Sequence, residues 1–139
     1  ESIDSIFLQL TDYSPSILTL KADSSRLYEM RRYTTNSGKL KKLDARFRDH
    51  TVKLFTKHGI TNLPYFHLTE GQDGQNTTLL YFLSFENEES RNASFEAFSK
   101  DQDWVDAKNA SQSDGGPILI KKGVASTLLK ATHYSPTSP

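Results

Sequence analysis

Charged and aromatic side chains alternate along the stretch YEMRRY, which has the composition of a strand. Because successive strand residues point to opposite faces, Glu29, Arg31 and Tyr33 share one face, and Tyr28 and Met30 share the other. If Tyr28 and Met30 pack under helices, the first three line any space that the other face encloses. Arg31 is then the best candidate to hold an anionic or carbonyl-bearing ligand, since its planar fork binds such groups bidentately. The simpler alternative is an ion pair of Glu29 with Arg31 that only fixes a subunit interface.

Histidine and tyrosine supply the remaining candidates for acid–base or ligand chemistry. His67 alternates with Tyr65 on a second predicted strand, and Tyr81 lies on the strand expected to pair with it. If that face is enclosed, these side chains become acid–base or haem-ligand candidates. His50 lies on or beside the apolar face of a predicted helix, where a purely structural role is the simpler reading. The candidate catalytic residues are Arg31, Tyr33, His67 and His50, and the candidate ligand-binding residues are Glu29, Arg31, Tyr65 and Tyr81.

The sequence lacks the motifs of the common metal and phosphate sites. His50 and His58 are two helical turns apart, too far to chelate one ion, and cysteine is missing. Neither a glycine-rich phosphate loop nor a G-x-S-x-G nucleophile turn occurs. We therefore predict no metal and no cofactor, with haem bound by His67 or His50 as the alternative.

Length and charge restrict the class of protein. A chain of 139 residues fits one domain. Its 17 basic and 17 acidic residues balance, which removes long-range attraction to phosphate backbones, so nucleic acid is not an expected partner. No apolar run approaches the roughly 20 residues of a membrane-spanning helix, so we predict a soluble chain without a membrane span.

Hydrophobic periodicity and turn residues predict seven elements that must position these candidates. Strands are expected at 27–34, 60–70, 76–86 and 118–134, with a bend or bulge at Gly123 in the last. Helices are expected at 36–59, 86–101 and 101–113, and Ala93, Phe95, Ala97 and Phe98 should be buried in the second. The order β, α, β, β, α, β is that of a ferredoxin-like α+β unit, an antiparallel sheet with helices on one face.

One face of this sheet would remain uncovered. In LLYFLSF, one set of side chains points one way (Leu79, Tyr81, Leu83 and Phe85), and Leu80 and Phe82 point the other. A sheet with helices on one side only leaves one of these apolar sets in water. We therefore predict that two such units pair face to face.

Residues 28–59 resemble the opening of NIPSNAP domains, which runs Y-E-L-R-x-Y, a short turn with P-G-K-L, a phenylalanine-rich helix with a histidine, and K-H-G. DQDW at 101–104 is similar to the D-P-E-W turn of that family, and the resemblance extends over 27–134. It implies a dimeric α/β barrel, in which two ferredoxin-like units stack their open sheet faces.

The function implied by this resemblance is a NIPSNAP-like binding module. It would act as a homodimer or paired with a second domain of the same type, and its further partner would be a protein or a small molecule. The wider superfamily includes cofactor-independent oxygenases and haem-dependent proteins. The alternative is therefore a small-molecule oxygenase that uses Arg31, Tyr33 and His67 in the cavity between the sheets.

The two ends of the chain are similar to each other. Residues 5–16 and 126–137 align without gaps and agree at half of twelve positions, including Thr11 with Thr132 and Tyr13-Ser14-Pro15 with 134–136. We interpret residues 1–25 as a strand and linker, the remnant of a preceding NIPSNAP-like repeat, and 26–139 as the domain. The alternative is that Tyr-Ser-Pro merely ends a strand, since proline cannot donate to a ladder.

Overall fold

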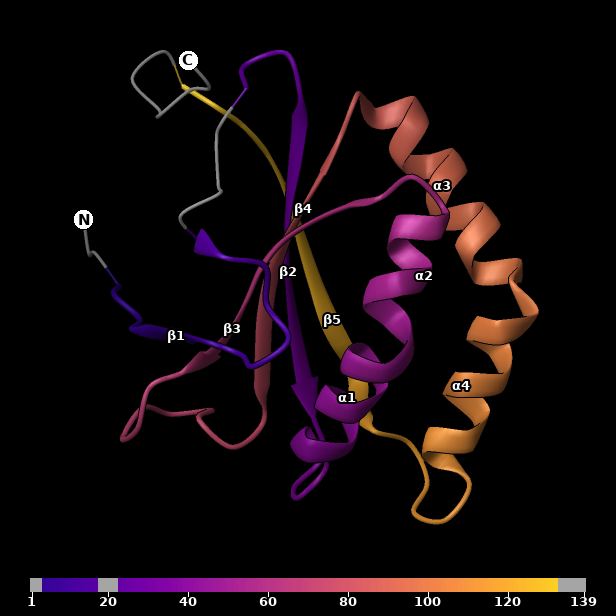
Figure 1. The fold of residues 1–139 in the computed structure, drawn as a ribbon. Helices are drawn as coiled ribbons and strands as arrows, with labels where there is room; N and C mark the ends of the chain where they lie inside the picture. Colours follow the sequence, from indigo (N-terminus) through magenta and orange to yellow (C-terminus); the bar gives the residue numbers. More distant parts are fainter. Residues whose placement is uncertain (1–3, 18–22, 133–139) are drawn as a thin grey trace.

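A twisted antiparallel sheet forms one layer of the molecule, and the helices form the other (Figure 1). The computed structural model describes residues 4–17 and 23–132. The strands follow the order β1-β3-β4-β2-β5 across the sheet. Their bounds are β1 (Leu8–Leu10), β2 (Leu27–Thr35), β3 (Thr61–Leu68), β4 (Thr78–Phe85) and β5 (Leu119–Lys130).

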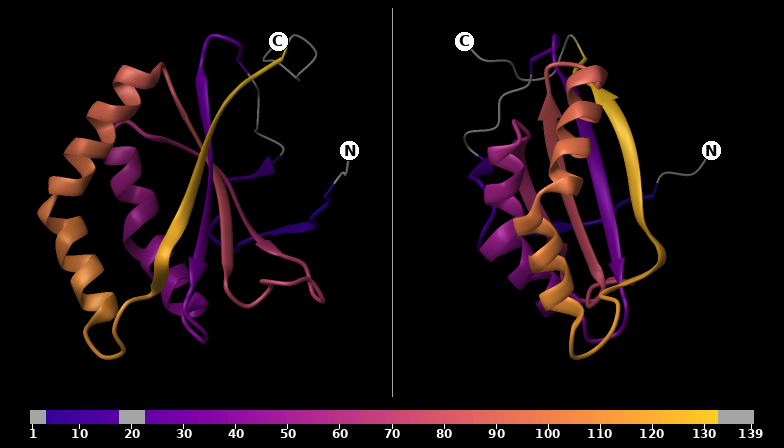
Figure 2. Two further views of the ribbon diagram at one scale, coloured as in Figure 1. Left: turned by 180° about the vertical axis from the view of Figure 1, so that it is seen from behind. Right: turned by 90° about the vertical axis from the view of Figure 1, so that its right-hand side faces the viewer.

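The helices all cover the same face of the sheet (Figure 2). They are α1 (Leu40–Arg46), a π-helical turn η2 (Phe47–Thr51), α2 (Val52–Lys57), α3 (Glu88–Lys100) and α4 (Gln102–Gln112). Strands β2 to β5 with these helices form the predicted ferredoxin-like unit, so the fold class is confirmed. No helix in the described part of the chain is both long enough and apolar enough to cross a bilayer.

Side-chain caps and glycine turns explain several element boundaries. The Asn87 side chain accepts a hydrogen bond of 2.8 Å from the Ser90 amide at the start of α3, and Asp101 caps α4 in the same way. The loop between β3 and β4 contains Gly71 and Gly74, both at positive φ, as the GQDGQ sequence predicts for a hairpin. β3 and β4 pair antiparallel, as expected.

The long predicted helix begins later and is less regular than its sequence indicates. It starts at Leu40 and contains the wide turn η2, where the Thr51 hydroxyl donates a hydrogen bond of 3.3 Å to the Arg46 carbonyl. Leu43, Phe47 and Leu54 are buried against the sheet. Their spacing fits a regular α-helix as well as one that contains this turn. The sequence pattern therefore could not reveal it.

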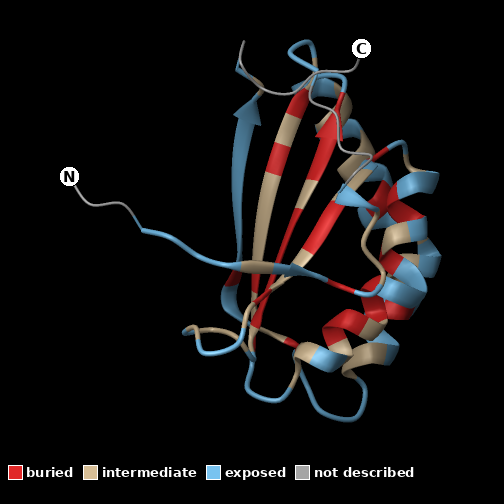
Figure 3. Ribbon diagram, turned by 60° about the vertical axis from the view of Figure 1, so that its left-hand side comes forward, coloured by how far each residue is buried: buried red, intermediate tan, exposed pale blue. Residues whose placement is uncertain are grey.

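Aromatic rings fill the space between the sheet and the helices. Figure 3 shows that the buried residues lie on the central strands and on the helices that cover them. Tyr65 stacks on Tyr81 with their ring centroids 4.7 Å apart, and Phe47 meets Tyr81 at 5.2 Å. The set formed by Leu79, Tyr81, Leu83 and Phe85 faces the helices and is buried. In α3, Phe98 is buried and Phe95 partly so, but Ala93 and Ala97 are exposed, so the prediction for these two alanines was wrong. The two phenylalanine rings of that helix pack against Phe85 and Phe55.

The two faces of β2 are the reverse of the expected arrangement. Glu29 pairs with Leu83 and Arg31 with Tyr81 across the ladder, and paired residues share a face. Glu29, Arg31 and Tyr33 therefore point toward the helices, while Tyr28 and Met30 lie on the open face. The charged side chains are stable there because Arg91 of helix α3 pairs with Glu29. The alternation of residues along a strand does not reveal such a partner.

Gly123 lies at an irregularity in β5, as predicted. The register between β2 and β5 shifts between Tyr33 and Thr35, and Lys122 adopts a positive φ of 58°. A Cβ on Gly123 would lie 2.6 Å from the Thr34 carbonyl oxygen. Only glycine allows the strand to bend this closely against its neighbour.

Candidate functional site

Five of the predicted site residues form one cluster beneath the helices: Glu29, Arg31, Tyr33, Tyr65 and Tyr81. Arg31 is its centre. Its Nε donates to the Tyr81 hydroxyl at 2.9 Å, its Nη1 to Glu29 Oε2 at 2.7 Å, and its Nη2 to the Tyr33 hydroxyl at 3.2 Å. The predicted ion pair of Glu29 with Arg31 is present, but it lies inside one unit and not at a subunit interface.

Helix α3 completes this cluster with Arg91, a residue that the sequence did not single out. Arg91 Nε donates to Glu29 Oε1 at 2.7 Å, and the Ser126 hydroxyl on β5 donates to Glu29 Oε2 at 2.7 Å. Burial opposes ionisation of Glu29, but the hydrogen bonds from Arg91, Ser126 and Arg31 outweigh it and lower the pKa of its carboxyl to about 2. Arg91 is far from Glu29 in the sequence, and no motif connects the two.

Tyr65 and Tyr81 of the cluster are held in their neutral form. Burial raises the pKa of the Tyr81 hydroxyl well above its ordinary value, and it does the same for Tyr65. Tyr81 donates to the Tyr33 hydroxyl at 3.1 Å, and the Tyr65 hydroxyl donates to Asn62. The polar groups of the cluster thus satisfy one another, and their rings pack against Phe47. This arrangement is a closed polar core rather than an open binding site.

His67 belongs to a second cluster, on the same side of the sheet. Its Nε2 lies 2.9 and 3.0 Å from the two oxygens of Asp44, on α1. The Tyr13 hydroxyl donates to Asp44 at 2.8 Å, and burial raises the pKa of that hydroxyl well above its usual range. Sequence reasoning identified His67 but neither Asp44 nor Tyr13, because three separate segments meet here.

Asp44 engages Nε2 of the candidate haem ligand His67, so only its Nδ1 could be offered to an iron. Within residues 4–17 and 23–132, no group of three or more His, Cys, Asp or Glu side chains could hold a metal ion. His58, for its part, ends α2 and lies 2.6 Å from Asp101, a structural contact.

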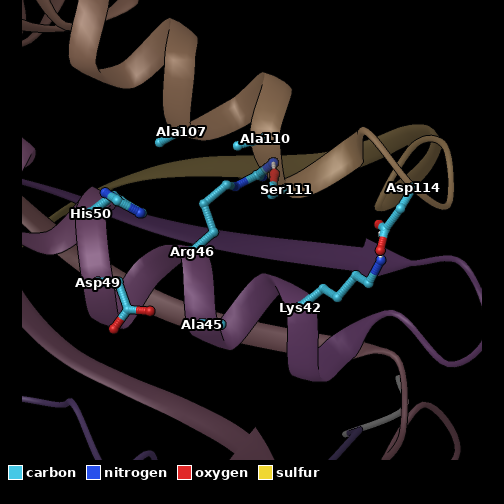
Figure 4. A pocket seen from close by; sticks show the side chains of 9 residues that line it. All are labelled: Lys42, Ala45, Arg46, Asp49, His50, Ala107, Ala110, Ser111 and Asp114. Atoms are coloured by element: carbon cyan, nitrogen blue, oxygen red, sulfur yellow. Dashed lines mark hydrogen bonds and ion pairs between the residues drawn. The ribbon is translucent and has the colours of Figure 1, made fainter.

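His50 lies apart from both clusters, in a cleft of about 330 Å³ between α1–η2 and α4 (Figure 4). The cleft is lined by Lys42, Ala45, Arg46, Asp49, His50, Ala107, Ala110, Ser111 and Asp114. Arg46 reaches from α1 across the cleft, and its Nη1 donates to the Ser111 hydroxyl at 3.3 Å. The sequence pattern that places His50 beside the apolar stripe could not show that α4 packs opposite it.

The open face of the sheet carries apolar side chains on its central strands. Met30 pairs with Phe82, and Phe66 pairs with Leu80, across neighbouring strands. The rings of Phe66 and Phe82 meet edge to face at 6.2 Å. Leu129 on β5, which pairs with Tyr28 and so shares this face, is 39% exposed. Most of these side chains are only half buried in a single unit.

The N-terminal segment is part of the same sheet. β1 pairs antiparallel with β3, and beyond it the Thr11 amide donates to the Tyr65 carbonyl at 3.0 Å. The Ser14 hydroxyl accepts a hydrogen bond of 2.9 Å from the Tyr65 amide, and the Tyr13 ring packs against that of Tyr65. Thr11, Tyr13 and Ser14, which recur near the C-terminus, are thus the residues that hold this segment in place.

The family model described as NIPSNAP matches residues 28–136. A NIPSNAP-like domain protein from Burkholderia xenovorans superposes with a TM-score of 0.68 at 15% identity, covering 84% of this chain and 94% of that one. A NIPSNAP family protein of unknown function from Agrobacterium tumefaciens gives 0.67 at 16% identity, over 86% and 100% of the two chains. SnoaB, a cofactor-independent oxygenase from Streptomyces nogalater, gives 0.50 at 10% identity, over 78% and 95%. None of the curated proteins matches the sequence.

Proposed function

The chain belongs to the NIPSNAP family, and on this premise we propose that it is a binding module that pairs with a second NIPSNAP-like unit. The proposed pairing surface is the open face of the sheet, the face through which units pair in the dimeric α/β-barrel fold that the family resemblance implies; the likeness of fold to the solved structures supports this. The observation that carries this proposal is the half-buried apolar surface on the central strands of that face.

The open face has the properties of a pairing surface. Its centre is mostly apolar, with Leu80 only 2% exposed beside the charged Arg32, whereas Leu10 and Leu129 nearer the edges are 44% and 39% exposed. Burying such side chains against a second sheet contributes roughly 25 cal/mol per Å² of apolar area. A contiguous apolar surface of this kind on a polar chain favours association with another protein over exposure to water.

The N-terminal segment supports a tandem arrangement of such units. In this structure, Thr11, Tyr13 and Ser14 fix a strand to the edge of β3. The same residue types occur at 132–136, although residues 133–139 lie outside the part of the chain that the structure describes. We interpret residues 1–25 as the last strand and linker of a preceding repeat. Residues 127–136 would then occupy the β3 edge of a paired unit in the same way.

Molar mass in solution tests the pairing. Light scattering across a range of protein concentrations should give twice the mass of one chain for the wild type, and Phe82→Asp should give a single chain that remains folded by circular dichroism. Lys41→Asp, on the exposed side of α1, is the matched control and should stay paired. A wild type that remains a single chain at every concentration would overturn pairing between two copies.

The alternative function, a small-molecule oxygenase, has less support. Its predicted residues Arg31 and Tyr33 do not face the space between two sheets, because both point toward the helices. The region that they do face is filled by the rings of Phe47, Tyr65 and Tyr81. The likeness to SnoaB is one of fold, so the geometry of this chain favours the binding module.

A further inference from the structure

Arg46 is a buried cation that forms no ion pair within the described residues. Its side chain is 5% exposed. It makes one long hydrogen bond, from Nη1 to the Ser111 hydroxyl at 3.3 Å, and its guanidinium lies 5.2 Å from the centre of the Trp104 ring. Its Nε is buried without a hydrogen-bond partner. Neither the hydroxyl nor the ring carries a negative charge.

The arginines of the buried cluster around Glu29 differ in this respect. Arg31 and Arg91 share the Glu29 carboxylate, and even the exposed Arg48 is paired with Asp12 at 2.8 Å. Burying a guanidinium without a counter-charge is unfavourable. Accordingly, burial lowers the pKa of Arg46, whereas the net effect around Arg31 is to raise it. Arg46 is therefore a charge whose counter-charge the described part of this chain does not supply.

The surroundings of Arg46 can accept an anion. Lys42, His50 and Ser111 line the same cleft. The cleft continues into a second one, of about 440 Å³, that shares His50 and is lined further by Lys53, Asp103 and Asp106. In Figure 4, Ser111 lies beside the end of the Arg46 side chain, and the Lys42 side chain extends toward Asp114.

Two carboxylates also line the cleft, but neither neutralises Arg46. Asp49 points away from the guanidinium (Figure 4). Asp114 is bound by Lys42 at 2.6 Å in a pair that is largely exposed, and such pairs contribute little stability and exchange readily. An anion that enters the cleft can therefore replace Asp114 as the partner of Lys42.

We propose that the cleft between α1–η2 and α4 binds a phosphate group, either inorganic phosphate or a phosphate monoester. The planar guanidinium of Arg46 binds two phosphate oxygens, the geometry for which arginine is best suited. Lys42 donates a further hydrogen bond, and His50 flanks the phosphate on the other side. The Ser111 hydroxyl, which donates to the Lys108 carbonyl at 2.7 Å, holds the guanidinium in place by accepting from it. This site is separate from the pairing surface, because the helices that form it cover the opposite face of the sheet.

Titration with inorganic phosphate tests this site. Calorimetry at constant ionic strength, with chloride as the reference anion, should show saturable binding by the wild type. Arg46→Met should weaken that binding by at least about tenfold, the loss expected for a charged hydrogen-bonding partner. His50→Ala and Lys42→Met should each weaken it less. Lys41→Met removes the same charge from the exposed side of α1 and should leave binding unchanged.

Several results would overturn the proposal. They are the lack of saturable phosphate binding by the wild type, equal binding by wild type and Arg46→Met, or equal weakening by Lys41→Met and Lys42→Met. If Arg46→Met does not fold, the comparison of His50→Ala and Lys42→Met with Lys41→Met decides the question. Phosphoserine that binds more tightly than inorganic phosphate would identify an ester as the ligand, and the reverse order would identify free phosphate. Phe82→Asp should bind phosphate normally, so failure of pairing and failure of this site are distinguishable.

Discussion

Arg91 on α3 and Glu29 on β2 are joined by two hydrogen bonds, of 2.7 and 3.1 Å, across the boundary between the helices and the sheet. Glu29 is wholly buried, so Arg91 is the link by which a helix holds a charged strand position in place. The cluster around Glu29 is for this reason a stabilising core, and the first two predictions concern it.

Removing Arg91 should destabilise the protein substantially. Arg91→Met leaves the buried Glu29 carboxylate with Arg31 as its one cationic partner, and breaking a buried pair from one side costs about 3 kcal/mol. Urea unfolding followed by circular dichroism measures this loss. Lys100→Met is the matched control, since it breaks an exposed pair with Glu96 on the same helix and should leave the midpoint unchanged. Equal midpoints for both variants would contradict the role of Arg91.

Glu29 should make stability depend on acid pH. Its pKa is lowered in the folded protein from 4.5 to about 2, so it stabilises the fold above pH 4.5, and this contribution is lost as the pH falls from 4.5 toward 2. Glu29→Gln should be less stable at neutral pH and should lose less stability across that window. Urea unfolding at a series of pH values compares the two proteins. If the free energies of unfolding of the two proteins changed in parallel with pH, Glu29 would not contribute to the acid dependence of stability.

Tyr13→Phe should loosen the N-terminal segment locally. It removes the hydrogen bond to Asp44, and the aromatic ring is kept. The Thr11 amide, which donates to the Tyr65 carbonyl, should exchange its hydrogen faster, and the amides between β2 and β4 should be unaffected. Hydrogen exchange read by NMR measures both sets. An unchanged Thr11 amide would mean that β1 is held without Tyr13.

Gly123→Ala should strain the junction of β2 and β5. Its Cβ would lie 2.6 Å from the Thr34 carbonyl oxygen and 2.8 Å from that of Ile120, and both are backbone atoms. Such overpacking costs about 2 kcal/mol. Gly38→Ala is a useful comparison, because Gly38 has a positive φ but no neighbouring atom within 4 Å; its loss should be the smaller, about 1 kcal/mol. Thermal unfolding orders the two, and a larger loss for Gly38→Ala would contradict the steric account.

Most of the fold could be predicted from local sequence patterns. The alternation in LLYFLSF separated the two faces of β4, and two glycines identified the hairpin before it. These two signals succeed because they depend on neighbours close in the sequence. The echo of residues 5–16 at 126–137 directed attention to Tyr13 and Ser14, which hold the first strand against β3.

The candidate site was harder to predict, because its partners are distant in the sequence. Alternation along β2 separated Glu29 from Tyr28 correctly but could not say which of the two faces the helices. Polarity suggested the wrong face, since Arg91 and Ser126, which make a buried Glu29 acceptable, come from α3 and β5. The unpaired state of Arg46 was equally invisible, because it depends on which side chains α4 brings to the cleft.

The irregular start of β5 affects the tendency of the protein to aggregate at high concentration. β5 is an edge strand, and a straight, uncharged edge invites other chains to extend the sheet into fibrils. Here Lys121 and Lys122 are exposed at a bulge that bends the strand at Gly123. Charge and curvature together make that edge a poor template for further strands. The protein can therefore expose the apolar side chains of its open sheet face and still resist aggregation through its edge.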